Sequence, residues 1–174
     1  MTTRRLAAAL LCTAVMAVTA GCSTPATVPA DFCKVPVSKT ALAPLIPHDG
    51  PVRQTYYATE GQPGAGCALS AGGHRVLFVA FATWDHDPDP GAWKGSAAPY
   101  KYAAERPVSF PGRAAIGSNG ASVRALCTSP DTYMTFGIYF FGDRVENTPN
   151  GYKKLRPFID DFVPKETKKF GCTR

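Results

Sequence analysis

Two long runs of alternating side chains constrain most strongly what this chain can fold into. They span residues 75–84 and 132–141, and both patterns repeat every second residue, which is the period of a β-strand. In the first run both sets of alternate side chains are apolar, so we expect a central strand covered on both faces. In the second run one set is more apolar, and that set fixes the register of the strand. Its members are Met134, Phe136, Ile138 and Phe140.

Turn residues beside the two runs predict hairpins. The Gly-Gly pair at 72–73 connects the first run to residues 66–70, and residues 129–131 connect the second run to 122–128. Residues 52–58 are a further strand candidate. The sequence therefore predicts about five strands, and the hairpin connections make them antiparallel.

The C-terminal part of the chain is predicted to be helical. Its apolar side chains at helical spacing are Tyr152, Leu155, Ile159 and Phe162. Pro157 is expected to kink or divide this helix, and Pro164 to end its regular part, because proline lacks a backbone N–H. A short helix is expected at 38–46. The fold class that follows is α+β: a single domain at 32–174, with an antiparallel sheet of about five strands covered by the C-terminal helix.

Four cysteines of the predicted domain are expected to form two disulfides. They are Cys33, Cys67, Cys127 and Cys172. An even number of cysteines in an exported domain is typical of a disulfide framework, and four cysteines allow three pairings. We favour Cys33–Cys67 with Cys127–Cys172, because each bridge then joins one end of the chain to a neighbouring strand. No two cysteines have the C-x-x-C spacing of a redox motif or zinc knuckle, so we expect no metal and no cofactor.

The N-terminus has the pattern of an export signal. Arg4 and Arg5 precede an apolar run from Leu6 to Val18, and small residues then lead to Cys22. The run has about 13 residues, whereas a membrane span needs about 20. An ordinary signal peptide is the alternative, and cleavage after Ala20 would then leave Cys22 as a free thiol.

The end of this signal resembles a bacterial lipobox, in which the cysteine is lipidated and becomes the mature N-terminus. The resemblance implies a signal peptide at 1–21, a lipid on Cys22 that anchors the chain to the membrane, and a flexible Pro- and Thr-containing tether at 22–31. The order of these segments, the cysteine positions and the closing Gly171-Cys172 resemble small lipoproteins of high-GC actinobacteria. This resemblance implies an extracytoplasmic location and a small domain, and it transfers no functional residues.

The charge of the chain does not favour a nucleic-acid partner. The formal net charge is +6, of which Arg4 and Arg5 contribute two through the signal. No cluster of Lys and Arg is interleaved with aromatic residues in the way that a nucleic-acid surface requires. We expect the basic residues near the C-terminus to be solvated helix faces, with weak attraction to anionic lipid or wall polymer as the alternative.

Aromatic residues gather in the irregular part of the sequence and form the candidate binding surface. They are Trp84, Trp93, Tyr100, Tyr102 and Phe110. Aromatic rings with a few polar groups are typical of a pocket or a partner surface, and loops on a rigid scaffold often carry function. The alternative interpretation is that these rings fill the open side of the sheet.

The acidic segment Asp85–Asp89 is the candidate for a metal or catalytic site. Its alternating aspartates could bind Ca²⁺, but Pro90 and Ser96 stand where an EF-hand loop needs Gly and Glu. A hydrolase site would need His48 or His74 to lie beside this segment, and the chain has no G-x-S-x-G or S-x-x-K nucleophile motif. We therefore assign no catalytic residue.

These observations favour a lipid-anchored protein of the cell envelope with a non-enzymatic binding role. The expected partners are the membrane through Cys22, and an envelope protein, a wall polymer or an apolar small molecule through the aromatic surface. An envelope hydrolase with a site near Asp85–Asp89 and a purely structural surface protein are the alternatives.

Overall fold

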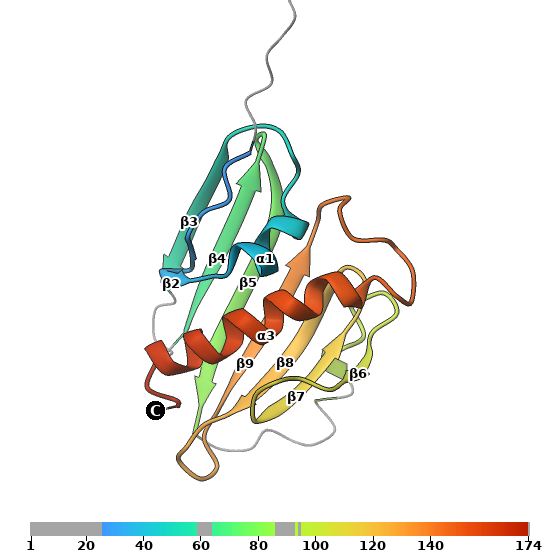
Figure 1. The fold of residues 1–174 in the computed structure, drawn as a ribbon. Coiled ribbons are helices and arrows are strands. Elements are labelled where there is room, and N and C mark those ends of the chain that lie inside the picture. Colours follow the sequence, from blue (N-terminus) through green and yellow to red (C-terminus); the bar gives the residue numbers. More distant parts are fainter. Residues whose placement is uncertain (1–25, 59–63, 86–92, 94, 174) are drawn as a thin grey trace, which may run out of the picture.

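The computed structural model describes residues 26–58, 64–85, 93 and 95–173 (Figure 1). The helices are α1 (Lys39–Leu42), the 3₁₀ helix η1 (Ala43–Leu45) and α3 (Tyr152–Lys169). The strands are β1 (Asp31–Phe32), β2 (Val35–Pro36), β3 (Val52–Ala58), β4 (Gly64–Ala71), β5 (His74–Trp84), β6 (Ala104–Arg106), β7 (Gly112–Ile116), β8 (Gly120–Leu126) and β9 (Tyr133–Phe140).

The main sheet has seven antiparallel strands in the order β3-β4-β5-β9-β8-β7-β6, and α3 crosses one of its faces (Figure 1). The prediction of an α+β domain covered by a C-terminal helix is confirmed, but the estimate of about five strands is wrong. The missed strands are β6 and β7, and a small β1–β2 sheet is also present. The sequence of β7 is Gly-Arg-Ala-Ala-Ile and that of β6 is Ala-Glu-Arg. The residues of both strands have little β-propensity of their own. Both strands therefore depend on pairing with β8 and its neighbours.

Helix α3 is continuous through both of its prolines, so the predicted division at Pro157 and the predicted stop at Pro164 are wrong. Pro164 leaves the carbonyl of Asp160 without its helical donor, and the Ser109 hydroxyl donates to that carbonyl at 3.4 Å. Burial of the apolar stripe outweighs the cost of the prolines, which is about 3 kcal/mol for one in a helix interior. The buried apolar side chains of α3 are Leu155, Phe158, Ile159, Phe162 and Val163.

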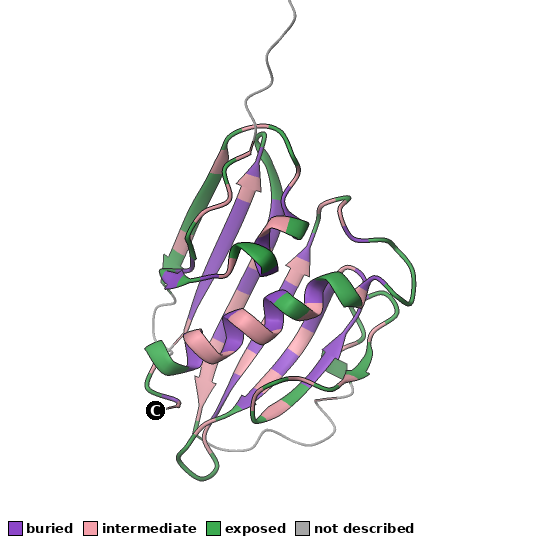
Figure 2. Ribbon diagram, in the orientation of Figure 1, coloured by how far each residue is buried: buried purple, intermediate pink, exposed green. Residues whose placement is uncertain are grey.

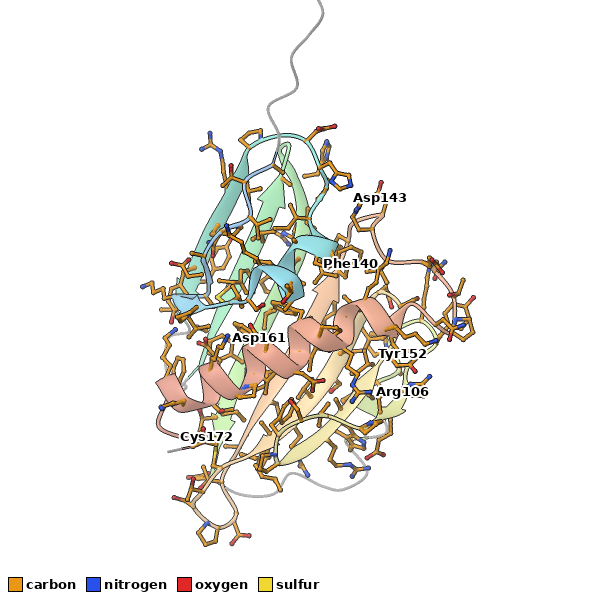
Figure 3. The ribbon with its side chains drawn as sticks, in the orientation of Figure 1. Arg106, Phe140, Asp143, Tyr152, Asp161 and Cys172 are labelled. Atoms are coloured by element: carbon orange, nitrogen blue, oxygen red, sulfur yellow. A yellow bond between two sulfur atoms is a disulfide. The ribbon has the colours of Figure 1, made fainter. Side chains whose placement is uncertain are left out.

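Two adjacent aspartates attach α3 to the loops on either side of it. Asp161 Oδ2 accepts the backbone N–H of Ser38 at 2.8 Å, and Asp160 Oδ1 accepts that of Ser109 at 2.9 Å. Figure 3 shows Asp161 on α3 near α1, and Arg106 beside Tyr152, whose ring centroid lies 4.1 Å from the guanidinium carbon. These contacts fix the helix across the sheet.

Both disulfides form with the favoured pairing. Cys33–Cys67 joins the turn between β1 and β2 to β4, and Cys127–Cys172 joins the end of β8 to the chain after α3. The bridged residues are 34 and 45 positions apart, and closing loops of this length stabilises a fold by about 4 kcal/mol each in the chain-entropy account. Disulfides persist in oxidising compartments, so the two bridges indicate an extracytoplasmic environment.

Residues upstream of Phe32, where the sequence placed the start of the domain, already contact the folded domain. The backbone N–H of Ala26 donates to the His48 carbonyl at 2.7 Å, and Val28 packs against the core. Cys22 and the predicted signal at 1–21 lie outside the described residues. Among the helices that the structure describes, none has the length and apolar character needed to cross a bilayer.

Candidate functional site: a groove on the open face of the sheet

The two faces of the main sheet are covered to different extents. On β9, Phe136 and Ile138 face α3 and are buried, whereas Thr135, Gly137 and Tyr139 face the opposite side and are half-buried. The same alternation of buried and half-buried residues runs along the central strands in Figure 2. We call the side away from α3 the open face.

A row of small residues crosses the open face at right angles to the strands. Cross-strand pairing places Gly66 opposite Ala80, Ala80 opposite Gly137, and Gly137 opposite Ser122. Tyr57 continues the row onto the edge strand β3. Because neighbouring strands lie about 4.8 Å apart, the row from β3 to β8 is about 19 Å long. Small side chains on successive strands leave a groove, which we call the open-face groove.

Aromatic side chains wall the groove on both sides. Phe78 and Tyr139 are cross-strand neighbours on one side, with ring centroids 6.2 Å apart. On the other side, Trp84 donates from Nε1 to Thr135 Oγ1 at 2.9 Å. A Cβ atom at Gly137 would lie 3.4 Å from the Tyr139 ring, so even a methyl group there would touch the wall. The width of the groove therefore depends on its small floor residues.

Two cavities of about 710 Å³ and about 410 Å³ occupy the groove and meet at Thr135 and Gly137. Both volumes lie in the range of small-molecule sites, about 300–1,000 Å³. The larger cavity lies over β4 and β5, and its floor includes Gly66, Ala80 and Ala82. The smaller cavity lies over β8 and β9, under the segment that carries Trp93 and residues 95–100.

Close contacts with the sheet hold this covering segment in place. The Tyr100 ring packs on Gly120, where a Cβ atom would lie 2.6 Å from the ring, so the contact requires glycine. Burial raises the pKa of the Tyr100 hydroxyl, and a hydrogen bond with Tyr139 raises it further. The Ser122 hydroxyl donates to Ser96 Oγ at 2.9 Å, and Ser96 donates to the Trp93 carbonyl at 2.8 Å. The segment therefore closes one end of the groove.

Arginines on the open face stack on aromatic rings. Arg124 lines the smaller cavity and lies 4.4 Å from the Tyr133 ring centroid. Arg113 lies 4.9 Å from the Trp93 ring centroid and forms an ion pair with Glu105 at 2.8 Å. Such stacking contributes about 0.5–1 kcal/mol at exposed sites, and it keeps cationic groups beside the groove.

The structure brings together three of the five aromatic residues proposed from the sequence. Trp93 and Tyr100 line the smaller cavity, and Trp84 lines neither cavity but is bonded to Thr135, which lines both. Tyr102 is exposed and lines neither cavity of the groove, and Phe110 lies on the other side of the sheet in a cavity that includes residues of α3. Sequence reasoning missed Tyr57, Phe78, Tyr139 and Arg124 as groove residues. The alternation assigned Phe78 and Tyr139 each to one side of its own strand, but the sequence did not show that these sides form one face or that this face stays open.

The acidic segment and the histidines do not form a cluster in the described structure. His74 begins β5 and Asp85 follows its last residue, so the two are about 36 Å apart along an extended strand. The backbone hydrogen bond from Gly72 to Pro51 places the chain after His48 at the same end as His74. His86, Asp87 and Asp89 lie outside the described residues. Within the described ranges, no group of three or more His, Cys, Asp or Glu side chains could hold a metal ion.

Comparisons of the chain with protein-family models, with curated proteins and with solved structures found no match. The groove is therefore interpreted from its own geometry.

Proposed function

We propose that this protein is a lipid-anchored protein of the cell envelope that binds an apolar small molecule in the open-face groove. The observation that carries the proposal is the row of small residues that crosses from β4 to β8 between aromatic walls. A sheet face that is only a structural surface has no need of four small residues in register on adjacent strands. Their alignment leaves apolar wall surface for a ligand to cover.

The lining of the groove favours an apolar ligand. Phe78, Ala80 and Ala82 expose carbon atoms over the larger cavity, and polar side chains are few there. Burying apolar surface against such a lining stabilises a complex by about 25 cal/mol per Å² before the costs of association. The largely preformed walls lower those costs, because the Trp84 ring is already held by its bond to Thr135.

The short distance from Cys22 to the folded domain supports a position beside the membrane. Ala26 is attached to the domain through His48, and Cys22 lies four residues before it. Four residues span at most about 14 Å, so a lipid on Cys22 would hold the domain close to the bilayer. Apolar molecules partition into the bilayer, which would supply the ligand locally.

Nile red, a neutral apolar dye, tests the binding proposal. The chain contains two tryptophans: Trp93 lines the smaller cavity, and Trp84 is bonded to Thr135, which lines both cavities, so tryptophan quenching reports binding there. We expect saturable dye binding that Ala80→Phe weakens by about tenfold or more, because the new ring fills the groove floor. Ala104→Phe, the same substitution at an exposed alanine of β6, is the matched control and should bind as the parent does. Equal binding by both variants would refute the proposal.

The anchor is tested separately by the intact mass of the membrane-extracted protein. We expect a mature chain that begins at Cys22 and carries a diacylglyceryl group. Cys22→Ser should release the protein from the membrane, since a single unlipidated tether gives no lasting attachment. An unmodified Cys22 would remove the anchor from the proposal and leave the groove as it is.

A further inference from the structure

The two edge strands of the main sheet, β3 and β6, differ in how well they can accept another strand (Figure 1). β6 has three residues, of which two are charged, and a short charged strand is a poor template for pairing. β3 has seven residues, of which only Arg53 is charged, and it contains no proline. Its register with β4 is continuous from Val52 to Ala58. β3 therefore presents a long, regular edge of the kind to which another strand adds.

Alternate residues of β3 direct their backbone groups away from β4. The Gly72 N–H donates to the Pro51 carbonyl at 3.1 Å, in register with the pairs of β3 and β4 that follow. Because hydrogen-bonded and non-hydrogen-bonded pairs alternate along antiparallel strands, every second residue after Pro51 bonds to β4 and the others point outward. The residues that point outward are Val52, Gln54, Tyr56 and Ala58. Among the described residues, the backbone hydrogen bonds outside helices and strands include none from these outward groups.

A second copy of β3 matches this edge in antiparallel register. When Thr55 lies opposite Thr55 of the second copy, the whole strand pairs and every outward residue meets an outward residue. This register provides about eight backbone hydrogen bonds. Its two-fold axis passes between the two threonines, so both copies use the same surface, as in most homodimers.

The side chains that this register pairs on the open face are complementary. Arg53 lies opposite Tyr57 of the second copy, and Thr55 lies opposite Thr55. In non-hydrogen-bonded pairs of this kind the Cα atoms are about 4.5 Å apart and the side chains are closest. A guanidinium beside an aromatic ring and a pair of threonines are both favourable cross-strand neighbours. Arg53 is exposed and takes part in none of the ion pairs among the described residues.

On the side of β3 that faces α3, the register brings opposite charges together. Asp31 Oδ1 accepts a hydrogen bond from Gln54 Nε2 at 3.1 Å. Lys34 Nζ lies 4.2 Å from the Tyr56 ring centroid. Since Gln54 lies opposite Tyr56 of the second copy, Asp31 of each copy comes beside Lys34 of the other. This contact occurs twice, once on each side of the axis.

We infer that two copies of this protein associate through β3 and join their main sheets into one. The second copy also completes the groove, because Tyr57 lines its open end and Arg53 of the second copy lies opposite that ring. The association does not depend on the proposed function, and only this closure of the groove rests on it. An edge-strand contact buries less than the roughly 1,600 Å² of a standard interface, so we expect a dissociation constant in the micromolar range.

Sedimentation equilibrium tests the association. The protein carries Cys22→Ser and is exported so that both disulfides form. Between about 1 µM and about 500 µM, its average mass should rise from that of one chain toward twice that value. Thr55→Lys places two ammonium groups opposite each other on the axis and should weaken association about tenfold or more. Ala104→Lys, the same charge at an exposed residue of β6, is the matched control and should associate as the parent does.

Cysteine substitutions test the register. Thr55→Cys should form a disulfide between two chains, because Cα atoms opposite each other on the axis are within the range that a disulfide requires. Arg53→Cys is the control: the two substituted residues would be about 14 Å apart and should not cross-link. Nile red should bind the cross-linked Thr55→Cys dimer about threefold more tightly than it binds Thr55→Lys, since the second copy closes the groove.

A charge exchange tests the contact on the side that faces α3. Asp31→Lys should weaken association, because it brings two ammonium groups together, and Lys34→Glu in the same chain should restore it. Thermal unfolding of each variant shows whether it is folded.

Three results would overturn the inference. They are a mass that stays at one chain up to about 500 µM, cross-linking of Arg53→Cys but not of Thr55→Cys, and association that Thr55→Lys leaves unchanged. All three leave the proposed function standing. Equal binding of Nile red by the cross-linked dimer and by Thr55→Lys would refute only the closure of the groove. If the dimer forms in this register but Nile red does not bind, the proposed function fails and the association stands.

Discussion

The two faces of the sheet are built from the same strands but are completed in different ways. Toward α3, Phe136 packs at 5.7 Å from Phe81 and at 6.3 Å from Phe162, measured between ring centroids, and side chains fill the space. On the open face, the residue next to Phe136 is Gly137, which has no side chain, and a Cβ atom there would lie 3.4 Å from the Tyr139 ring and 3.5 Å from the Tyr100 hydroxyl. One face therefore forms the core, and the other carries the open-face groove. The difference comes from residue size at alternate positions, since both faces are largely apolar.

The largest expected effect is a difference in the free energy of unfolding between substitutions on the two faces. Phe136→Ala should lower the free energy of unfolding by about 3–5 kcal/mol, because it leaves a cavity between the sheet and α3. Tyr139→Ala, three residues along the same strand and half-buried on the open face, should cost much less. Urea unfolding monitored by circular dichroism measures both. Equal losses would contradict the assignment of the core to one face.

The disulfides provide a second comparison of the two faces, since both connect covering segments to the side of the sheet that faces α3. Replacing Cys127 and Cys172 together by serine should lower the free energy of unfolding by about 2–4 kcal/mol. The same substitution should leave Nile red affinity unchanged under conditions where the protein is folded. A change in affinity without unfolding would mean that the groove depends on the position of α3.

Gly120→Ala tests the contact that closes the groove. A Cβ atom there would lie 2.2 Å from the Ile138 carbonyl oxygen and 2.6 Å from the Tyr100 ring. We expect a loss of about 1–3 kcal/mol in the free energy of unfolding and displacement of Tyr100. Gly72→Ala is a control for added bulk, since its Cβ would meet no atom within 4 Å, although its φ of +57° adds some backbone strain.

The smallest expected effect concerns two carboxylates in different environments. Glu166 is fully buried; burial raises its pKa, and the Lys169 ammonium, 3.0 Å from Oε1, only partly opposes this. A raised pKa gives a stabilisation that is complete below the ordinary value of 4.5 and is lost as the pH rises through the raised value. Glu166→Gln should therefore unfold less readily than the parent at about pH 7 and similarly at about pH 4.

Glu105 lies on the open face, and its pKa shift has the opposite sign to that of Glu166. Its hydrogen bond from Arg113 lowers its pKa, so its stabilisation is present above 4.5 and is lost as the pH falls through the lowered value. Because the pair is exposed, solvent screens it, and Glu105→Gln should change stability only slightly. Urea midpoints from about pH 4 to about pH 7 compare the two variants. Parallel pH profiles for Glu105→Gln and Glu166→Gln would contradict the assigned environments.

The long strands and the disulfides could be predicted because their signals are local or few in number. The alternation at 75–84 predicts β5 within a residue, and only three pairings of four cysteines exist. The strands β6 and β7 could not be predicted, because their residues pair only once β8 is in place. The bounds of α3 were predicted wrongly because of Pro157 and Pro164. The free-energy cost of a proline in a helix can be read from the sequence, whereas the burial of apolar side chains that outweighs it depends on tertiary packing.

The candidate site divides in the same way. The sequence identified Trp84, Trp93 and Tyr100 as aromatic residues near irregular structure, but it also grouped Phe110 with them. Which ring faces which side depends on strand order and register. The two hairpins place β4 beside β5 and β8 beside β9, but the chain positions do not reveal that β5 pairs with β9.

The sequence by itself predicted an export signal, and it determined the strand periods and the amphipathic helix, because each of these signals lies in residues close together in the chain. It also determined the cysteine framework, because four cysteines allow only three pairings. The tertiary structure alone decided that Gly66, Ala80, Gly137 and Ser122 lie in one row. It also decided that α3 covers the opposite face. A groove is a property of register across several strands, and register is set by long-range pairing and core packing.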